Sequence, residues 1–519
     1  MESNKENTRV AKSATIVFLI SGIRWVLACA RIVFVAYLFG AALSYDAYLV
    51  AFTLPEIIME LLVGVIGITF IPIFTDYLVK EGEVSAWNFA SNLINILLII
   101  GIFLTILMGF MAPTIVRIVA PSFDSNSFQL AVRIMVLIIP LILIVSLADL
   151  ITRILHSYQR FTAVAFSRVF ELIAVIICLV LFSKEYGIFS LAIGLVSGAL
   201  VRLIFQFPFL WNKFKYYQLK LNFALPGIKK VIFISGPIIS CMIFLRIGKI
   251  IERALASSLK EGSISVLSYA NAFNEVPREL FLCALGVVLF PLISKYASEN
   301  KMDNFKAVIS KGIRVGNFIL IPIAISFIFF GKQIIGCLLE RGEFVGSMTQ
   351  DTSIALAIYA LTLLVMAVYY FCAQACYALQ EVKPTIKFAI IVLVIDIILK
   401  LILINYLSFA GLALATSISL IIHSGLLAGF IRKKIGSFDE RAIFLSSLKT
   451  LGVSLLMAGT CWFVLSLVPY NVHRVMRLTI LMGTAGISYI AFSYLSRSQE
   501  LLSVGDLLRN MVFKAGRKI

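Results

Sequence analysis

Fourteen apolar stretches run along this chain of 519 residues, and each is roughly 20 residues long. A helix of about 20 residues spans the hydrocarbon core of a bilayer. Because lipid offers the backbone no hydrogen-bonding partner, only helices and closed β-barrels span membranes. These stretches are too long for barrel strands and lack their alternation of polar and apolar residues. The sequence therefore predicts an all-α polytopic membrane protein with about 14 transmembrane helices.

The composition excludes a water-soluble protein. Hydrophobic residues make up 61% of the chain and charged residues only 14%, and the mean hydropathy is +1.01. Soluble domains usually carry about 25% charged residues. A buried core cannot absorb this apolar excess, because a folded chain of this length still needs a large polar surface. Lipid must therefore be the solvent for much of the chain.

The net charge of +18 would suggest binding to nucleic acid if the chain were soluble. Here, most of the 45 Lys and Arg fall in loops on one side of the predicted spans, a bias that marks the cytoplasmic side. An even number of spans places both termini on that side. We expect these loops to face anionic membrane lipids and predict no nucleic-acid partner.

Signals of metal, nucleotide and disulfide chemistry are missing from the sequence. The 8 cysteines form no CxxC pair and nearly all lie within or beside predicted spans, and the 3 histidines are scattered. We expect packing or helix-end roles for these residues, no metal and no cofactor. Without a Walker A or DxD sequence, and with short outer loops, a membrane enzyme such as a polyprenyl-phosphate transferase is disfavoured, and we predict no catalytic residues.

An internal repeat links the two halves of the chain. Residues 67–77 read GITFIPIFTDY and residues 286–296 read GVVLFPLISKY, with Gly, Pro and Tyr at identical spacing. The repeat joins the second predicted span to the eighth, an offset that suits two six-helix lobes of similar orientation. We predict an N-terminal lobe at 1–222, a C-terminal lobe at 223–435, and two further spans with a cytoplasmic tail at 436–519.

Several motifs occur in an order that resembles the MurJ/MviN family of lipid II flippases, over nearly the whole chain. They are FGA at 39–41, DAYLVAF at 46–52, SISVLSY at 263–269, LFPLISKY at 289–296, LLERGEF at 338–344, YALQEVKPTIK at 377–387 and AGLALATS at 410–417. That family belongs to the multidrug/oligosaccharidyl-lipid/polysaccharide exporter superfamily. The resemblance implies fourteen spans, with two lobes around a central cavity and the last two spans beside a groove for a lipid tail.

The resemblance also implies a function. It predicts a flippase that moves a polyprenyl-pyrophosphate-linked peptidoglycan precursor, lipid II, across the bacterial inner membrane by alternating access. The expected partners are the lipid-linked oligosaccharide substrate, membrane lipids and the cell-wall synthesis machinery. A missing nucleotide-binding motif leaves the membrane potential or an ion gradient as the energy source.

Charged residues inside the spans are candidates for the transport path, because an unpaired charge costs several kcal/mol at the bilayer centre. Arg24 and Arg31 lie seven residues apart and so share one helix face. Two guanidiniums facing a cavity suit a pyrophosphate, whose oxygens Arg binds bidentately. Arg31 matches an arginine that the family uses in its cavity, Arg24 lies one position from another, and the resemblance adds Asp46 and Glu275 to the predicted substrate site.

The second and eighth spans depart from the family pattern. An arginine pair commonly follows the Leu-Pro motif in the family, but here the positions carry Glu56, Met59 and Glu60. The arginine that the family tends to have in the eighth span is replaced by Ala272. Glu56 and Glu60 lie one helical turn apart and place negative charge where the family binds an anion.

Other cations in the seventh and eighth spans could compensate for the missing family arginines. Arg246, Lys249 and Arg253 form one basic stripe in the seventh span, and Arg278 can pair with Glu275 in the eighth. These charges fit either a salt-bridged interface between lobes or a relocated substrate or coupling site. We expect three further sets of charges to neutralise themselves: Asp396 with Lys400, Arg168 with Glu171, and Asp149.

Two alternatives to lipid II transport stay open. A related exporter could act on another lipid-linked glycan or on a cationic compound, which Glu56, Glu60 and Ala272 would suit. A transport-inactive paralogue could serve as a scaffold in cell-wall synthesis, which would explain the missing arginines.

Overall fold

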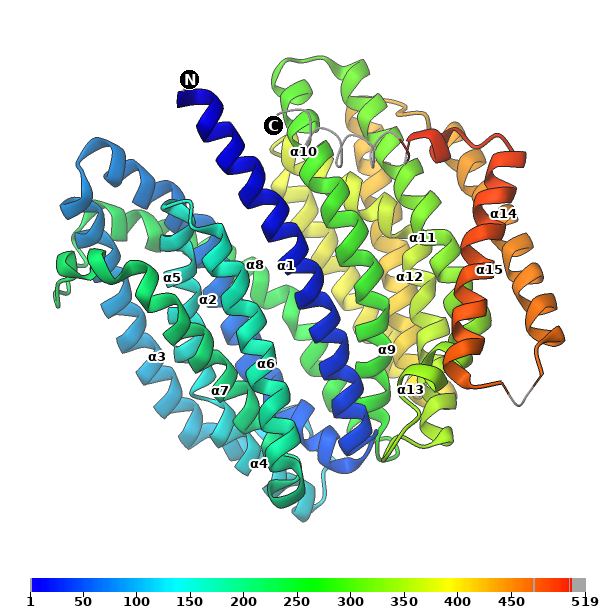
Figure 1. Cartoon of the computed structure of the whole chain (residues 1–519), viewed down its shortest axis with the longest axis horizontal. Coiled ribbons are helices and arrows are strands. Elements are labelled where there is room, and N and C mark those ends of the chain that lie inside the picture. Colours follow the sequence, from blue (N-terminus) through cyan, green and yellow to red (C-terminus); the bar gives the residue numbers. More distant parts are fainter. Residues whose placement is uncertain (1, 470–471, 504, 506–519) are drawn as a thin grey trace. The chain divides into compact units, whose positions relative to one another are not determined.

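Helices form almost the whole chain (Figure 1). The structure is a computed structural model that describes residues 2–469, 472–503 and 505, without the side chains of residues 1–19 and of several residues between 237 and 288. No β-strand occurs among the described residues, which confirms the predicted all-α class. The predicted tail beyond residue 505 and the side chains of Cys241 and Cys283 lie outside the described residues.

The chain divides into two compact units, of which the first comprises residues 1–262 and the second begins at Ser263. The helices of the first unit are α1 (Glu2–Phe39), α2 (Leu43–Lys80), α3 (Glu83–Val119), α4 (Ser125–Ile138), α5 (Leu141–Ser157), α6 (Phe161–Tyr186), α7 (Phe189–Gln206), the 3-10 helix η1 (Phe207–Tyr216) and α8 (Pro226–Ala256).

Local sequence sets several of these helix boundaries. Asp124 caps α4, because its carboxylate accepts hydrogen bonds from the backbone N–H groups of Asn126 and Ser127 at 3.1 and 3.3 Å. Pro226 begins α8, where its missing N–H costs nothing. Gly82 separates α2 from α3 with a φ of +86°, a conformation that glycine adopts without strain.

Aromatic side chains fill the core of the first unit. Phe70 and Phe74 of α2 stack at 5.1 Å between ring centroids, and Phe70 stacks on Phe89 of α3 at 5.6 Å. The buried indole of Trp87 donates a hydrogen bond to the hydroxyl of Tyr158 at 3.0 Å. Around this core, α2 packs against α4, α5 and α8, and α6 packs against α7 and α1 (Figure 1). These contacts position the charged residues of α1, α2, α5, α6, α7 and α8.

The second unit continues the helical architecture. Its elements are α9 (Ser263–Pro277), the π-helical turn η2 (Arg278–Leu282), α10 (Cys283–Ser298), α11 (Met302–Leu338), α12 (Gly346–Ala378), α13 (Val382–Ile435), α14 (Glu440–Leu467) and α15 (Arg474–Leu495). Helices α11, α12 and α13 pack in sequence around a core that includes Phe305, Leu363 and Phe371. The last two helices pack onto α11 through a smaller cluster that includes Cys461 and Leu481.

Eleven helical segments among the described residues are long and apolar enough to cross a membrane. One of them, α13, contains 54 residues and is interrupted at Ser408, whose φ of +53° is not helical. At 1.5 Å per residue, 54 residues would extend about 80 Å, far more than one bilayer crossing needs. A multi-pass membrane protein is therefore established, whereas the number fourteen stays a prediction.

The predicted lobe boundaries also stay predictions. The first compact unit ends at Gly262, whereas the predicted N-terminal lobe ends at residue 222. Helix α8 joins the first unit because it packs against α2 and α3.

Candidate functional site

The two arginines predicted to contact a substrate lie on α1 and are half-buried. The guanidinium of Arg24 lies over the ring of Trp25, 4.9 Å from its centroid. Arg31 lies near Tyr45 and Tyr48, at the start of α2, and its charge acts on both phenols. Neither arginine forms an ion pair with a residue that the structure describes, and their contact with a substrate stays a prediction.

The predicted acidic pair and the predicted basic stripe meet each other. Glu56 Oε2 lies 2.5 Å from Lys249 Nζ, and Glu60 Oε2 lies 2.9 Å from Arg246 Nε. The pairs join α2 to α8 inside the first unit. Because each carboxylate has its own cation, Glu56 and Glu60 add no net negative charge to this region. Arg253, the third member of the stripe, is buried and lies near enough to Tyr45 for its charge to act on that phenol.

A cavity of about 230 Å³ adjoins these ion pairs. Helices α2, α5, α6 and α7 contribute its lining, which is mainly apolar. Its polar groups are the carboxylates of Glu56, Glu60 and Glu171, and Met59 lies between the first two. The position where the family pattern has an arginine therefore opens onto this cavity.

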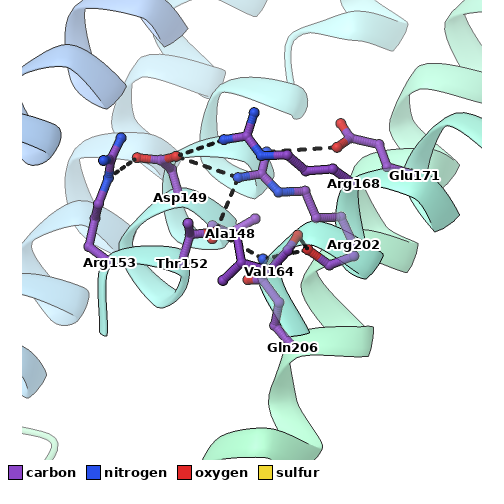
Figure 2. Close-up of polar contacts among 10 residues, drawn as sticks. Ala148, Asp149, Thr152, Arg153, Val164, Arg168, Glu171, Arg202 and Gln206 are labelled. Atoms are coloured by element: carbon purple, nitrogen blue, oxygen red, sulfur yellow. Dashed lines mark hydrogen bonds and ion pairs between the residues drawn. The ribbon is translucent and has the colours of Figure 1, made fainter. Parts of the chain in front are cut away.

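A larger polar network centres on Asp149 of α5 and includes Glu171, which lines the cavity (Figure 2). The Asp149 carboxylate is 1% exposed and faces three guanidiniums: Arg153 at 3.1 Å, Arg202 at 3.4 Å and Arg168 at 3.8 Å. Arg202 also lies 3.8 Å from Glu171. The expected neutralisation of Arg168 by Glu171 is therefore wrong: Arg168 pairs with Asp149, and Glu171 pairs with Arg202.

Neutral side chains complete this network. Arg202 donates to the hydroxyl of Thr152 at 3.3 Å, and Gln206 donates to Thr152 at 2.9 Å and to Ser167 at 3.1 Å. The sequence interpretation missed Arg153, Arg202 and Gln206. The signal for two of them was present, because Arg202 and Gln206 lie one turn apart in an otherwise apolar helix.

Asp46, another predicted substrate contact, is buried at the start of α2. Its side chain is 3% exposed, and its carboxylate accepts a hydrogen bond of 2.7 Å from the backbone N–H of Gly262. Gly262 has a φ of +83°, and a Cβ atom there would lie 2.1 Å from the carbonyl oxygen of Ala41. Asp46 therefore links the loop after α8 to the start of α2, and its role in substrate binding stays a prediction.

The second unit contains the remaining predicted charges. Arg278 pairs with Glu275 at 3.0 Å, as its i,i+3 spacing predicts, and Asn271 also donates to that carboxylate at 3.3 Å. Lys400 pairs with Asp396 at 2.8 Å, which confirms the predicted self-neutralisation. The first pair is half-exposed at the start of the π-helical turn η2, and the second is buried in α13.

The scattered histidines take packing and helix-end positions. His156 packs on Phe161 at 5.3 Å and His423 on Tyr369 at 4.9 Å between ring centroids. His473 caps α15, because its Nδ1 accepts a hydrogen bond from the backbone of Val475 at 3.3 Å. Within the described part of the chain, no group of three His, Cys, Asp or Glu residues is arranged to hold a metal ion.

The all-helical bundle defines a multi-pass membrane protein, and charged side chains paired inside its spans are typical of membrane transporters. The sequence model of the family described as "Lipid II flippase MurJ" matches residues 35–482, so the chain belongs to this family. The matched range includes Glu56, Glu60 and Glu275 and begins after Arg24 and Arg31.

Individual relatives agree with this family. The chain is 27% identical over 485 residues to a probable lipid II flippase MurJ of Buchnera aphidicola subsp. Acyrthosiphon pisum, covering 91% of this chain and 95% of the relative. It is 27% identical over 503 residues to the probable lipid II flippase MurJ of Vibrio cholerae serotype O1, covering 93% and 95%.

Solved structures extend the comparison. A lipid II flippase MurJ in an inward closed conformation matches with a TM-score of 0.78 and 25% identity, covering 93% of this chain and 99% of that one. An inward-facing multidrug resistance MATE family transporter of the MOP superfamily matches with a TM-score of 0.70 and 13% identity, covering 82% and 99%. The second likeness concerns the fold alone.

Proposed function

We propose that this chain is a flippase that translocates lipid II across the bacterial inner membrane by alternating access. The observation that carries the proposal is the family match over residues 35–482, together with relatives described as lipid II flippases along nearly their whole length. The chain acts as a transporter and catalyses no covalent step. Membrane lipids surround it, and the cell-wall synthesis machinery supplies and consumes its substrate.

In this proposal, Arg24 and Arg31 contact the pyrophosphate of lipid II. Both are half-buried cations on one face of α1 without an ion-pair partner among the described residues, and a guanidinium binds phosphate oxygens bidentately. The pairs Glu56–Lys249 and Glu60–Arg246 hold α2 and α8 together. Their neutrality removes the main reason for preferring a cationic substrate.

The proposed topology places both termini in the cytoplasm, because most Lys and Arg then lie on the cytoplasmic side. The proposed lobes comprise residues 1–222 and 223–435, followed by two further spans. Alternating access moves the lobes around the substrate, and the membrane potential or an ion gradient drives the cycle, since the sequence has no nucleotide-binding motif.

The direct test is lipid II accessibility in reconstituted vesicles. Purified full-length protein is placed in vesicles with fluorescent lipid II, and the fraction reached by a membrane-impermeant quencher is followed with and without a membrane potential. We expect exchange between leaflets that requires the protein and is lost in the double variant Arg24→Ala/Arg31→Ala. Exchange no faster than in protein-free vesicles would refute lipid II transport.

The scaffold alternative needs a separate test, because the family arginines are missing at Met59 and Ala272. The chain and its Met59→Arg/Ala272→Arg variant are expressed in a bacterium depleted of its own lipid II flippase. Growth supported by the unaltered chain shows transport. Growth supported only by the arginine variant, at equal membrane levels, shows that the unaltered chain does not transport lipid II, as the scaffold alternative predicts.

A further inference from the structure

A polar cavity of about 170 Å³ lies in the second unit, and none of the residues assigned to transport lines it. It lies between α11 and the segment that follows α15. The lining consists of two cations, one carboxylate, two neutral polar side chains and one apolar side chain: Lys311, Arg314, Glu500, Gln499, Ser503 and Val315. A single water needs about 10–15 Å³ of such space, so the cavity has room for a polyatomic group.

The chain after α15 is turned back to form one wall of this cavity. Arg497 has a left-handed φ of +52°, and the N–H of Ser498 donates to the carbonyl oxygen of Ser493 at 3.0 Å, a common way for a helix to end. Glu500 follows and is only 7% exposed. Its Oε1 accepts a hydrogen bond of 2.8 Å from the hydroxyl of Ser446 on α14. These contacts fix the segment and place Glu500 beside the cavity.

Arg314 of α11 has more donors than partners. Its NH1 lies 3.8 Å from Glu500 Oε1, longer than the roughly 2.7–3.2 Å of an N–H···O hydrogen bond. Its Nε is buried and donates to no group that the structure describes. A guanidinium has five N–H donors, and a buried donor without an acceptor destabilises the fold. An acceptor inside the cavity would satisfy donors that the protein leaves unused.

Lys311 adds a second cation on the same helix face. It precedes Arg314 by three residues, is exposed, and has no recorded partner among the described residues. Like charges at this spacing repel each other unless an anion lies between them. Within the described part of the chain, Glu500 is the one carboxylate of the lining, so two cations and one anion leave a net charge of +1. One negative charge would balance the cavity.

We propose that this cavity binds the phosphate group of an anionic phospholipid, with Arg314 and Lys311 as the residues that contact it. A guanidinium binds phosphate oxygens bidentately, and an ammonium binds them as a point charge. The side chains of Gln499 and Ser503 can donate further hydrogen bonds. The phosphodiester of phosphatidylglycerol carries the single negative charge that the lining lacks.

Two features favour a lipid over a soluble phosphate. Leu495 and Leu502, in the chain that forms the cavity wall, are each 74% exposed and offer apolar surface for acyl chains. In the proposed topology this segment follows the last span on the cytoplasmic side, where basic residues attract anionic headgroups. A bound lipid would fasten the segment after α15 to α11. This inference goes beyond the proposed function, because it concerns a site outside the predicted transport path.

The test titrates phosphatidylglycerol on the full-length protein in detergent and counts bound lipid by native mass spectrometry. We expect Arg314→Gln to weaken binding about tenfold and Lys311→Gln to weaken it about threefold. Lys311→Gln guards against misfolding, since it alters an exposed side chain without a recorded partner. The matched control is Lys449→Gln, which removes an exposed lysine of α14 that does not line the cavity and should bind like the unaltered protein.

Glu500 supplies a readout whose direction separates charge from structure. Glu500→Gln raises the net charge of the lining from +1 to +2, and its amide oxygen can still accept the hydrogen bond from Ser446. We expect this variant to bind phosphatidylglycerol about threefold more tightly. Weaker binding would contradict a site that recognises its ligand by charge.

The source of the phosphate is tested in nanodiscs by thermal unfolding. We expect phosphatidylglycerol in a phosphatidylcholine disc to raise the melting temperature of the unaltered protein more than that of Lys311→Gln. Inorganic phosphate should have no such effect. If inorganic phosphate stabilises the unaltered protein and Lys311→Gln abolishes this, the ligand is a soluble phosphate and the lipid assignment is wrong.

Two further results would overturn the site. Binding that neither Arg314→Gln nor Lys311→Gln weakens would show that the lipid lies elsewhere, and equal weakening by Lys449→Gln would show a general effect of surface charge. Lipid II exchange is measured separately on the same proteins. Failure of the cavity to bind phosphatidylglycerol would leave that exchange unaffected, so the two proposals fail independently.

Discussion

Glu56 on α2 and Lys249 on α8 approach to 2.5 Å, although 193 residues separate them in the chain. Both side chains remain about one third exposed, at 30% and 31%. The pair lies beside the cavity of the first unit, where its two charges cancel. Removing Glu56 should therefore make the charge near this cavity more positive, and removing Lys249 should make it more negative.

We predict that Lys249→Met impairs lipid II transport more than Glu56→Gln does. The first change leaves an unpaired carboxylate that repels pyrophosphate, and the second leaves an unpaired cation. The double variant should recover, since it removes both charges. Initial transport rates of the four proteins in vesicles form a double-mutant cycle. Equal impairment by both single variants would show that the pair acts only through stability.

The loop at Gly262 should tolerate no side chain. We predict that Gly262→Ala lowers the free energy of unfolding by more than about 2 kcal/mol, because a left-handed φ costs about 1–2 kcal/mol and the new Cβ would also meet Ala41. Gly187→Ala is the control: its φ is +52°, but its Cβ would meet nothing within 4 Å. Thermal unfolding in detergent compares the two. Similar losses of stability in Gly262→Ala and Gly187→Ala would contradict the close approach of residue 262 to Ala41.

The buried pair in α13 should be sensitive to the loss of one partner. Asp396 and Lys400 have side chains that are 12% and 4% exposed, so Asp396→Asn separates Lys400 from its carboxylate and Lys400→Met separates the buried carboxylate of Asp396 from its cation. We predict a loss of about 3–5 kcal/mol for each single variant and a much smaller loss for the double variant. Membrane expression level and thermal unfolding provide the measurement. A double variant as unstable as the worse single variant would be inconsistent with simple pairing.

The cap of α4 should make stability depend on pH in the acidic range. Hydrogen bonding by the Ser127 hydroxyl and by the backbone of Asn126 and Ser127 holds the pKa of Asp124 below its ordinary value of 3.8. Because this pKa is lower in the folded state than in the unfolded state, the ionised carboxylate stabilises the fold above pH 3.8. This stabilisation is lost as the pH falls further and the carboxylate is protonated. We predict that Asp124→Ala lowers the melting temperature at neutral pH.

The difference in melting temperature between Asp124→Ala and the unaltered protein should stay constant from neutral pH down to mildly acid pH. It should shrink below pH 3.8. Asp124→Asn serves as the control, because an uncharged amide can still accept the capping hydrogen bonds. Its difference from the unaltered protein should be small at neutral pH. If the melting temperature of Asp124→Ala stays below that of the unaltered protein by the same amount in strong acid, then the carboxylate is not the cause of the difference.

Apolar stretches of bilayer length determined the all-α membrane class from sequence alone, because a backbone in lipid must satisfy its own hydrogen bonds. Helical periodicity likewise predicted Glu275–Arg278 and Asp396–Lys400, since residues three or four apart share a helix face whatever the tertiary fold. Only the tertiary structure decided that Glu56 meets Lys249, and that Asp149 faces Arg202 across 53 residues. Partners on different helices depend on how those helices pack, which no local spacing encodes.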